Sequence, residues 1–380
     1  MTDAAPVNVG SPFLRTSLVF GAEPSSFLFV ADLFAGREPQ RIDAAAAAGA
    51  ESEIGFRPTV LLDSQAVTYL HQFVSGSSRL PSPRREIVET FLKFAVAKGL
   101  DYNPAFYFLE ALRRDDDASA EYAFATARSI LRLHTMSKQE FLTTGRLHPD
   151  PVALAPYQTE FGLETFDDIA AAYANAFVRE ARGHDLATSG AGRLSYAVLL
   201  TIAAIHRSRP GTGPRDIVWK CARFDEYLGA LGIGLAFERV VAIQHFAGGI
   251  DNFLPVQKGA NPERALARIR AAAWDIELLR VPATWLALPP EHGVIVAYPC
   301  TADRTLALLA QSFTLELVCV AGGTRPIFPV YKLSDPQLRE FARKTRVLQQ
   351  HASRTTEIGE GELSALIRDA EAEVRRACCD

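Results

Sequence analysis

The chain has 380 residues, of which 48% are hydrophobic and 22% are charged, a composition that excludes a disordered or fibrous protein. Its length exceeds what one hydrophobic core usually organises, so we expect two structural units or one elaborated unit. The formal net charge of −4 gives no global signature of nucleic-acid binding. Any site for a polyanion must be a local patch, which net charge neither supports nor excludes.

Cysteine usage, the N-terminus and the hydropathy all indicate the same compartment. The five cysteines show no CxxC spacing, which argues against a zinc ribbon, and their odd number suits free thiols in a reducing cytosol. The first residues, MTDAAPVNVGSPF, lack a basic region followed by an apolar core and do not form a signal peptide. The most apolar run, residues 194–205, is too short to span a bilayer. We therefore expect a soluble, cytoplasmic protein with no membrane partner.

Residues 1–53 are predicted to form an N-terminal arm. Within it, residues 17–20 and 27–34 could be strands separated by the turn-forming GAEPSS. The following RIDAAAAAGAESE is either a short Ala-rich helix or a linker.

The first strongly patterned stretch is TVLLDS, residues 59–64. Its unbroken run of apolar and β-branched residues is typical of a strand buried on both faces in a parallel sheet. The run ends in Asp63, and the C-terminal end of a strand is where open α/β sheets bind ligands. The same acid could instead cap the helix that follows. Both interpretations stay open from this stretch alone.

Helices are expected after this strand. After the strand, residues 65–74 and 86–98 have helical spacing, and Asn103 followed by Pro104 opens a further helix that carries Glu110. From about residue 115 the pattern changes to long helices with few β-branched runs, predicted over residues 118–133, 165–181, 193–207 and 216–246. Residues 115–260 are therefore predicted to be an all-helical insertion or second domain.

The chain then returns to an α/β pattern. A helix is predicted from residue 262 to about 280, with Asp275 in an apolar strip where an unpaired carboxylate is costly and a cation or donor is expected. A buried strand, GVIVAYPC, leads into Thr301 and Asp303. The remaining predicted elements are a helix at 305–311, a strand at 314–320 and a C-terminal helical tail at 331–380.

Four acids could meet at one edge of the predicted sheet. Asp63 and Asp303 each follow an apolar strand, and such strand ends lie along one edge of a right-handed parallel α/β sheet. Glu110 and Asp275 lie on helices that could lean over that edge. Four carboxylates would repel one another at neutral pH unless a cation were present. Hard divalent ions with oxygen ligands, Mg²⁺ or Mn²⁺, suit such a set and can activate water for attack on a phosphodiester.

The order TVLLDS, an acid on a helix, AAAWDIELL and a strand ending in TADRTLA resembles the PIN-domain nucleases. The resemblance covers about 54–112 and 262–325. It implies an α/β fold: a three-layer parallel-sheet PIN-like domain made of residues 54–114 and 261–330. In this family the second and third acids usually lie closer in sequence, so residues 115–260 become a large all-helical insertion.

The resemblance also implies a site and an activity. Asp63, Glu110, Asp275 and Asp303 would bind Mg²⁺ or Mn²⁺, and Thr301 stands where the family often has an assisting hydroxyl. The implied protein is a metal-dependent endonuclease, and RNA is the expected substrate because ribonucleases predominate in the family. The arginines near the acids are candidates for gripping phosphates: Arg113, Arg114, Arg268, Arg280 and Arg304. The helical insertion is the natural place for a protein inhibitor or partner.

Other interpretations stay open. Asp303 could merely cap a helix, and Asp275 could form a structural ion pair with Arg270 or Arg280. Glu110 could pair with the arginines three and four residues later. For the whole protein, the main alternative is a catalytically inactive PIN-like scaffold that binds a partner or nucleic acid through the helical insertion. A second alternative is a metal-dependent phosphohydrolase acting on small phosphate esters.

Overall fold

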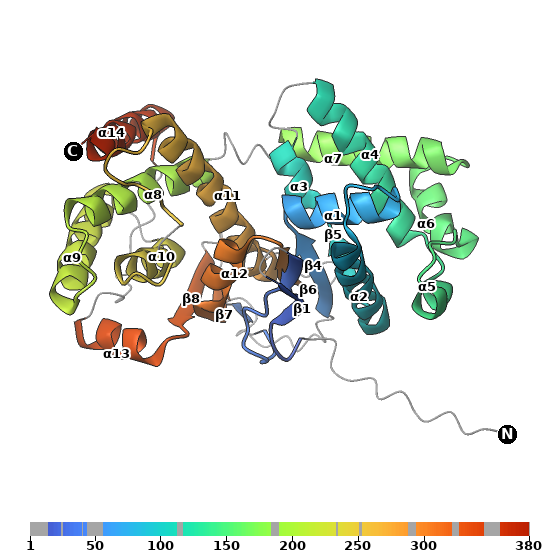
Figure 1. Ribbon diagram of the computed structural model, residues 1–380, viewed down its shortest axis with the longest axis horizontal. Helices are drawn as coiled ribbons and strands as arrows, with labels where there is room; N and C mark the ends of the chain where they lie inside the picture. The colour runs from blue at the N-terminus through green and yellow to red at the C-terminus, as the bar shows by residue number, and fades with distance from the viewer. Residues whose placement is uncertain are drawn as a thin grey trace.

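The structure, a computed structural model, describes the following residues of the chain: 14–23, 26–39, 41–43, 56–111, 117–183, 190–232, 235–250, 253–287, 294–320, 327–345 and 358–379. These residues form a mixed α/β protein with fourteen helices and eight strands. Figure 1 shows the strands in the middle of the molecule, with one group of helices on either side of them. The predicted α/β class is confirmed.

The central sheet has five strands in the order β1-β2-β6-β4-β5. Their bounds are β1 (Leu18–Glu23), β2 (Ser26–Val30), β4 (Phe56–Leu62), β5 (Asp101–Asn103) and β6 (Val294–Thr301). β4 is parallel to both β5 and β6, but β2 is antiparallel to β6 and β1 is antiparallel to β2. The predicted all-parallel sheet is therefore wrong at this edge, because the short link between β1 and β2 can join only antiparallel strands.

The N-terminal segment is part of the sheet. The two strands expected within the arm are present as β1 and β2, and β2 pairs with the core strand β6. The prediction that these residues form an appended arm is therefore wrong, because they belong to the central sheet. Farther along, Arg41–Asp43 form the short strand β3, and the rest of the Ala-rich stretch, residues 44–53, lies outside the described residues.

The register of β4 and β6 determines what stands at the end of the sheet. Leu61 lies beside Pro299 and Leu62 beside Cys300, and the amide of Asp63 donates to the Cys300 carbonyl at 2.9 Å. Leu62 is completely buried, as expected for a strand covered on both faces. The residues that follow the two strands therefore emerge side by side.

The helices after β4 pack together on one side of the sheet (Figure 1). They are α1 (Ser64–Val74), α2 (Ser82–Lys98), α3 (Ala105–Ala111), α4 (Asp117–His134), α5 (Lys138–Thr144), α6 (Pro151–Phe161) and α7 (Phe166–Gly183). α4 packs against α1 and α7, and α3 contacts α1, α4 and α7. Helices α5 and α6 were not predicted from the sequence. The predicted end of the helix at residue 98 is confirmed, because Gly99 closes α2 in a left-handed conformation with φ 64°.

The other helical group combines segments from two parts of the chain. Its members are α8 (Gly190–Ser208), α9 (Pro214–Leu231), α10 (Ala236–Phe246), α11 (Pro262–Ala287) and α14 (Glu360–Cys379). α8 packs against both α11 and α14. The stretch predicted as one helical insertion is helical, but its helices divide between the two sides of the sheet. The C-terminal helix also belongs to this group.

A second sheet has three strands in the order β3-β7-β8. α12 (Arg304–Gln311) leads from β6 to β7 (Phe313–Val320), and β8 (Ile327–Leu333) returns antiparallel before α13 (Pro336–Thr345). The predicted strand at 314–320 therefore lies outside the central sheet, and β8 was not predicted. The Leu315 amide donates to the Leu33 carbonyl at 2.6 Å, which ties this sheet to the chain leaving β2.

One contiguous hydrophobic core runs through the described residues, from Leu14 near the N-terminus to Cys378 on α14. A small satellite core under α6 contains Leu131, Ile169 and Ala170. Among the described helices, none is both long enough and apolar enough to cross a membrane.

Candidate functional site

The ends of β4 and β6 bring two of the predicted acids to one edge of the sheet. Asp63 directly follows β4, and Asp303 lies two residues after β6. Each also caps the helix that follows it. Oδ1 of Asp63 accepts from the Ala66 amide at 2.5 Å, and Oδ1 of Asp303 accepts from the amides of Thr305 and Leu306 at 2.6 and 3.0 Å. The capping interpretation is thus confirmed for both acids, and it leaves Oδ2 of Asp303 without a hydrogen bond from the described residues.

Thr301 links the two acids. Its buried hydroxyl donates to Oδ2 of Asp63 at 2.5 Å and accepts from the amide of Asp303 at 2.8 Å. Because one hydroxyl satisfies both bonds, the orientation of the Asp63 carboxylate depends on the turn that carries Asp303. Thr301 therefore lies among the acids, at the place predicted for it.

The pKa of Asp63 is raised to about 6, mainly because burial disfavours its charged form. Hydrogen bonds from Thr301 and Ala66 oppose this effect, and the negative charge of Glu110 adds to it. The charge of Glu110 therefore acts on Asp63 even though the two residues lie on different elements.

Glu110 is held at the site by a neighbour of Asp63. The hydroxyl of Ser64, the first residue of α1, donates to Oε2 of Glu110 on α3. Whether Glu110 reaches the other acids was an open question from the sequence, and this contact brings it to the start of α1. Ser64 was not predicted as a site residue. The only signal was its place after Asp63, since its partner lies 46 residues away.

Asp275 completes the group. Burial raises its pKa well above the usual value, and the negative charges of Asp303, Asp63 and Glu110 raise it further. The described hydrogen bonds and ion pairs give its carboxylate no partner. Asp275 therefore lies in the field of the other three predicted acids, and Asp63 lies in that of Glu110.

The alternative in which Asp275 forms a structural ion pair is wrong. Arg270 pairs with Glu371 at 3.3 Å. Arg280 lies in another network, where its Nη1 is 2.6 Å from Glu277 and its Nη2 contacts Glu238. Both arginines therefore have other partners, and no ion pair of the described residues includes Asp275.

An aromatic contact joins the two helices that carry Glu110 and Asp275. The rings of Phe106 and Trp274 are both buried, with centroids 5.8 Å apart and planes at 73°, an edge-to-face arrangement. Phe106 lies one turn before Glu110 on α3, and Trp274 directly precedes Asp275 on α11. This contact indicates that Trp274 packs in the hydrophobic core.

Of the five arginines predicted to bind phosphates, the structure describes three, and only two of these are exposed. Arg113 and Arg114 lie outside the described residues. Arg280 does not face the acids, because Glu238 and Glu277 hold it in a largely buried network; we correct its predicted role to a structural one. Arg304 and Arg268 are exposed. Arg304 directly follows Asp303, and Arg268 lies about two turns before Asp275 on the same face of α11.

The four carboxylates have the right chemistry to bind a hard divalent cation, but they are not arranged as a closed metal site. In the described part of the chain, no three His, Cys, Asp or Glu side chains are placed so that they could share one ion. Hydrogen bonds hold the carboxylates of Asp63, Glu110 and Asp303, and an ion would have to compete with them. The four carboxylates, which form no ion pair with another described residue, are nevertheless the oxygen ligands that Mg²⁺ and Mn²⁺ prefer.

Comparison of the chain with protein-family models found no match, and neither the curated proteins nor the solved structures gave a significant match. The functional argument therefore rests on the residues of the site.

Proposed function

We propose that this protein is a metal-dependent endonuclease with a PIN-like core, in which Asp63, Glu110, Asp275 and Asp303 bind Mg²⁺ or Mn²⁺. The observation that carries the proposal is Asp275, a carboxylate in the field of three other acids and with no cationic partner among the described residues. Such an arrangement costs stability unless the charges are neutralised by a cation or by protons.

The topology around the acids supports the PIN-like assignment. β5, β4 and β6 form a parallel core, and two of the acids follow the C-terminal ends of β4 and β6. The other two come from α3 and α11, in the chain order of the resemblance. RNA is proposed as substrate on that resemblance alone. Buried free thiols at Cys221, Cys300 and Cys378 agree with a protein that works in the reducing cytosol.

The roles of the chain's own residues follow from their contacts. The hydroxyl of Thr301 donates to the Asp63 carboxylate, and that of Ser64 donates to the Glu110 carboxylate. Each hydroxyl therefore orients a carboxylate that would bind the metal. Arg304 and Arg268 are placed to attract a phosphate backbone without reading its sequence. A bound divalent ion would neutralise the four acids and supply an activated water for hydrolysis of a phosphodiester.

The test is cleavage of labelled single-stranded RNA with Mn²⁺, with Mg²⁺ or with EDTA, by the wild type, Asp63→Asn and Asp303→Asn. Asparagine caps helices as well as aspartate does, so Asp303→Asn removes the charge and keeps the cap. Asp335→Asn is the matched control, because Asp335 caps α13 through the amides of Gln337 and Leu338 at 2.7 and 3.2 Å.

We expect metal-dependent cutting by the wild type and by Asp335→Asn, and a loss of at least about a hundredfold in both site variants. Cutting that survives Asp63→Asn and Asp303→Asn would rule out this site. No cutting together with no Mn²⁺ binding would favour the scaffold that binds a partner through its helices. Hydrolysis of a chromogenic phosphate ester without cutting of RNA would favour a small-ester phosphohydrolase.

Ser64→Ala is predicted to weaken Mn²⁺ binding about three- to tenfold, because it removes a hydrogen bond that holds Glu110. Ser75→Ala is the control at the opposite end of α1, since the Ser75 hydroxyl is exposed and, among the described residues, donates only to the Gln72 carbonyl, at 3.4 Å. Isothermal titration with Mn²⁺ measures both variants. Equal affinities in the two variants would show that Ser64 does not position a metal ligand.

A further inference from the structure

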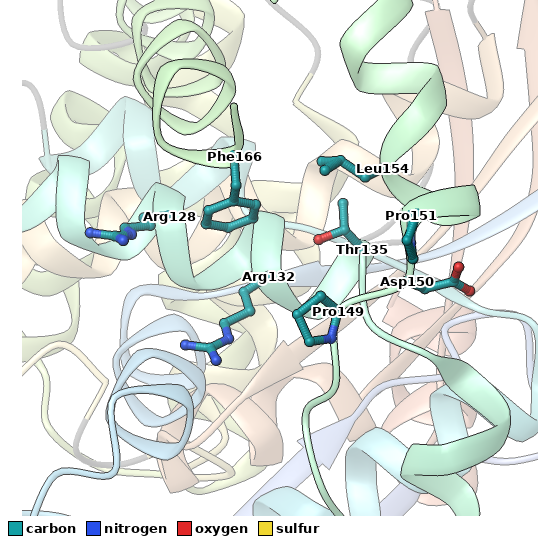
Figure 2. A pocket seen from close by; sticks show the side chains of 8 residues that line it. All are labelled: Arg128, Arg132, Thr135, Pro149, Asp150, Pro151, Leu154 and Phe166. Atoms are coloured by element: carbon teal, nitrogen blue, oxygen red, sulfur yellow. The ribbon is translucent and has the colours of Figure 1, made fainter. Parts of the chain in front are cut away.

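A cavity of about 360 Å³ lies among helices α4, α6 and α7. Figure 2 shows the side chains that line it: Arg128, Arg132, Thr135, Pro149, Asp150, Pro151, Leu154 and Phe166. None of these residues belongs to the four-acid site. Small-molecule sites typically enclose roughly 300 to 1,000 Å³. The cavity is therefore large enough for a compact ligand.

The surface that lines the cavity is mostly apolar, although two arginines, a threonine and an aspartate are among the residues around it. Phe166, the first residue of α7, supplies an aromatic face, and Leu154 with the rings of Pro149 and Pro151 supplies aliphatic surface (Figure 2). The hydroxyl of Thr135 is occupied by the Leu131 carbonyl at 2.9 Å. A ligand body that fits such walls is apolar, and a flat ring matches the face of Phe166.

The charges around the cavity are unequal. Arg128 is paired with Asp167 at 2.7 Å, so its charge is matched. Arg132 is exposed and belongs to no ion pair of the described residues. Figure 2 shows both arginines on the same side of the cavity, with Asp150 on the opposite side. One unmatched positive charge thus stands at one end, and a carboxylate at the other end disfavours an anion there.

We propose that this cavity binds a small molecule with one flat ring and one anionic group. The ring lies between Phe166 and the surface of Leu154 and Pro149, and the anion pairs with the guanidinium of Arg132. The inference is independent of the four-acid site, since it uses none of those residues and requires no catalysis.

The first test uses the aromatic sulfonate 1-anilinonaphthalene-8-sulfonate, whose fluorescence rises in an apolar site. We expect the full-length native protein to bind it saturably, with one site. Leu154→Trp fills the cavity and should abolish the signal. Val152→Trp is the control: Val152 is 79% exposed on the same helix and does not line the cavity. Equal binding by the two variants would overturn the proposal.

The second test separates the two arginines. Arg132→Gln should weaken probe binding about tenfold, the usual value of a charge-assisted hydrogen bond. Arg128→Gln should weaken it about twofold or less, because the Arg128 charge is already matched by Asp167. If both replacements weaken binding equally, or neither does, the assignment of the anion to Arg132 is wrong.

Displacement of the probe then defines the ligand. 2-Naphthoate and adenosine monophosphate both carry a ring and an anion, one as a carboxylate and the other as a phosphate. Displacement by either supports the site and identifies its preferred anion. Displacement by inorganic phosphate at the same concentration, or by neither ring compound, would contradict a site built for a ring and an anion together.

Discussion

Asp275→Asn is expected to stabilise the metal-free protein by about 1 to 3 kcal/mol and to abolish its response to Mn²⁺. The pKa of Asp275 is raised by burial and by three neighbouring acids, so its charged form destabilises the fold at neutral pH. Asparagine has nearly the same shape without the charge. A residue whose replacement improves stability and removes binding is kept for its function.

The measurement is urea unfolding at pH 7 in EDTA, followed by thermal unfolding with and without Mn²⁺. In the wild type, Mn²⁺ should raise the Tm, because an ion that binds only the folded state adds stability by mass action. In Asp275→Asn the Mn²⁺ effect should vanish, whereas Asp335→Asn should keep it. If Asp275→Asn is less stable than the wild type in EDTA, the carboxylate has a structural partner and the metal proposal loses its main support.

The sequence was most informative where a short apolar strand ended in an acid. TVLLDS and the strand leading to Thr301 were read as buried parallel strands, and the structure pairs them as neighbours. Local patterns sufficed there, because burial on both faces leaves a continuous apolar run. Helix caps were also visible: capping was one of the two interpretations kept open for Asp63 and for Asp303, and each of them caps the helix that follows it.

Other parts of the fold depended on partners that the sequence does not reveal. The predicted helix over 216–246 is two helices, and the first ends at Gly232 in a left-handed conformation with φ 66°. A glycine inside a helical pattern is compatible with either continuation or a stop. Likewise, nothing local shows that β2 pairs with β6, where Val30 lies beside Cys300, 270 residues later in the chain. Long-range pairing is decided by packing.

In the candidate site, too, some features were visible in the local sequence and others depended on long-range packing. That Asp63, Asp303 and Thr301 lie together followed from neighbouring strand ends, but the contact of Ser64 with Glu110 depends on how α3 sits against α1. Arg280 was predicted near the acids because it is close to Asp275 in sequence. On a helix, five residues turn a side chain to another face, where Glu238 and Glu277 bind it.

The difference in stability between the wild type and Asp63→Asn is predicted to change steeply with pH in the absence of metal. The pKa of Asp63 is about 6 in the folded protein, against an ordinary value of 3.8. Between these values the folded state binds a proton that the unfolded state has released. The free energy of unfolding therefore falls as pH rises from about 4 to about 6, by on the order of 3 kcal/mol for this one group. Asp275 acts in the same direction, because its pKa is also raised.

Taking the difference between the wild type and Asp63→Asn removes the contributions of other shifted groups, such as Asp32 and Glu277. Urea unfolding at pH 4, 5, 6 and 7 in EDTA gives this difference directly, and a flat profile would show that Asp63 is not buried among the other acids.

The same measurement with Mn²⁺ tests whether the protonation of the acids is linked to metal binding. A cation needs the deprotonated carboxylate, so its affinity should rise with pH through about 6, by up to about tenfold per pH unit for Asp63 alone, and Asp275, whose pKa is also raised, should add to this rise. The free energy of unfolding that the protein loses when these acids are deprotonated would then be restored by the ion that the acids bind.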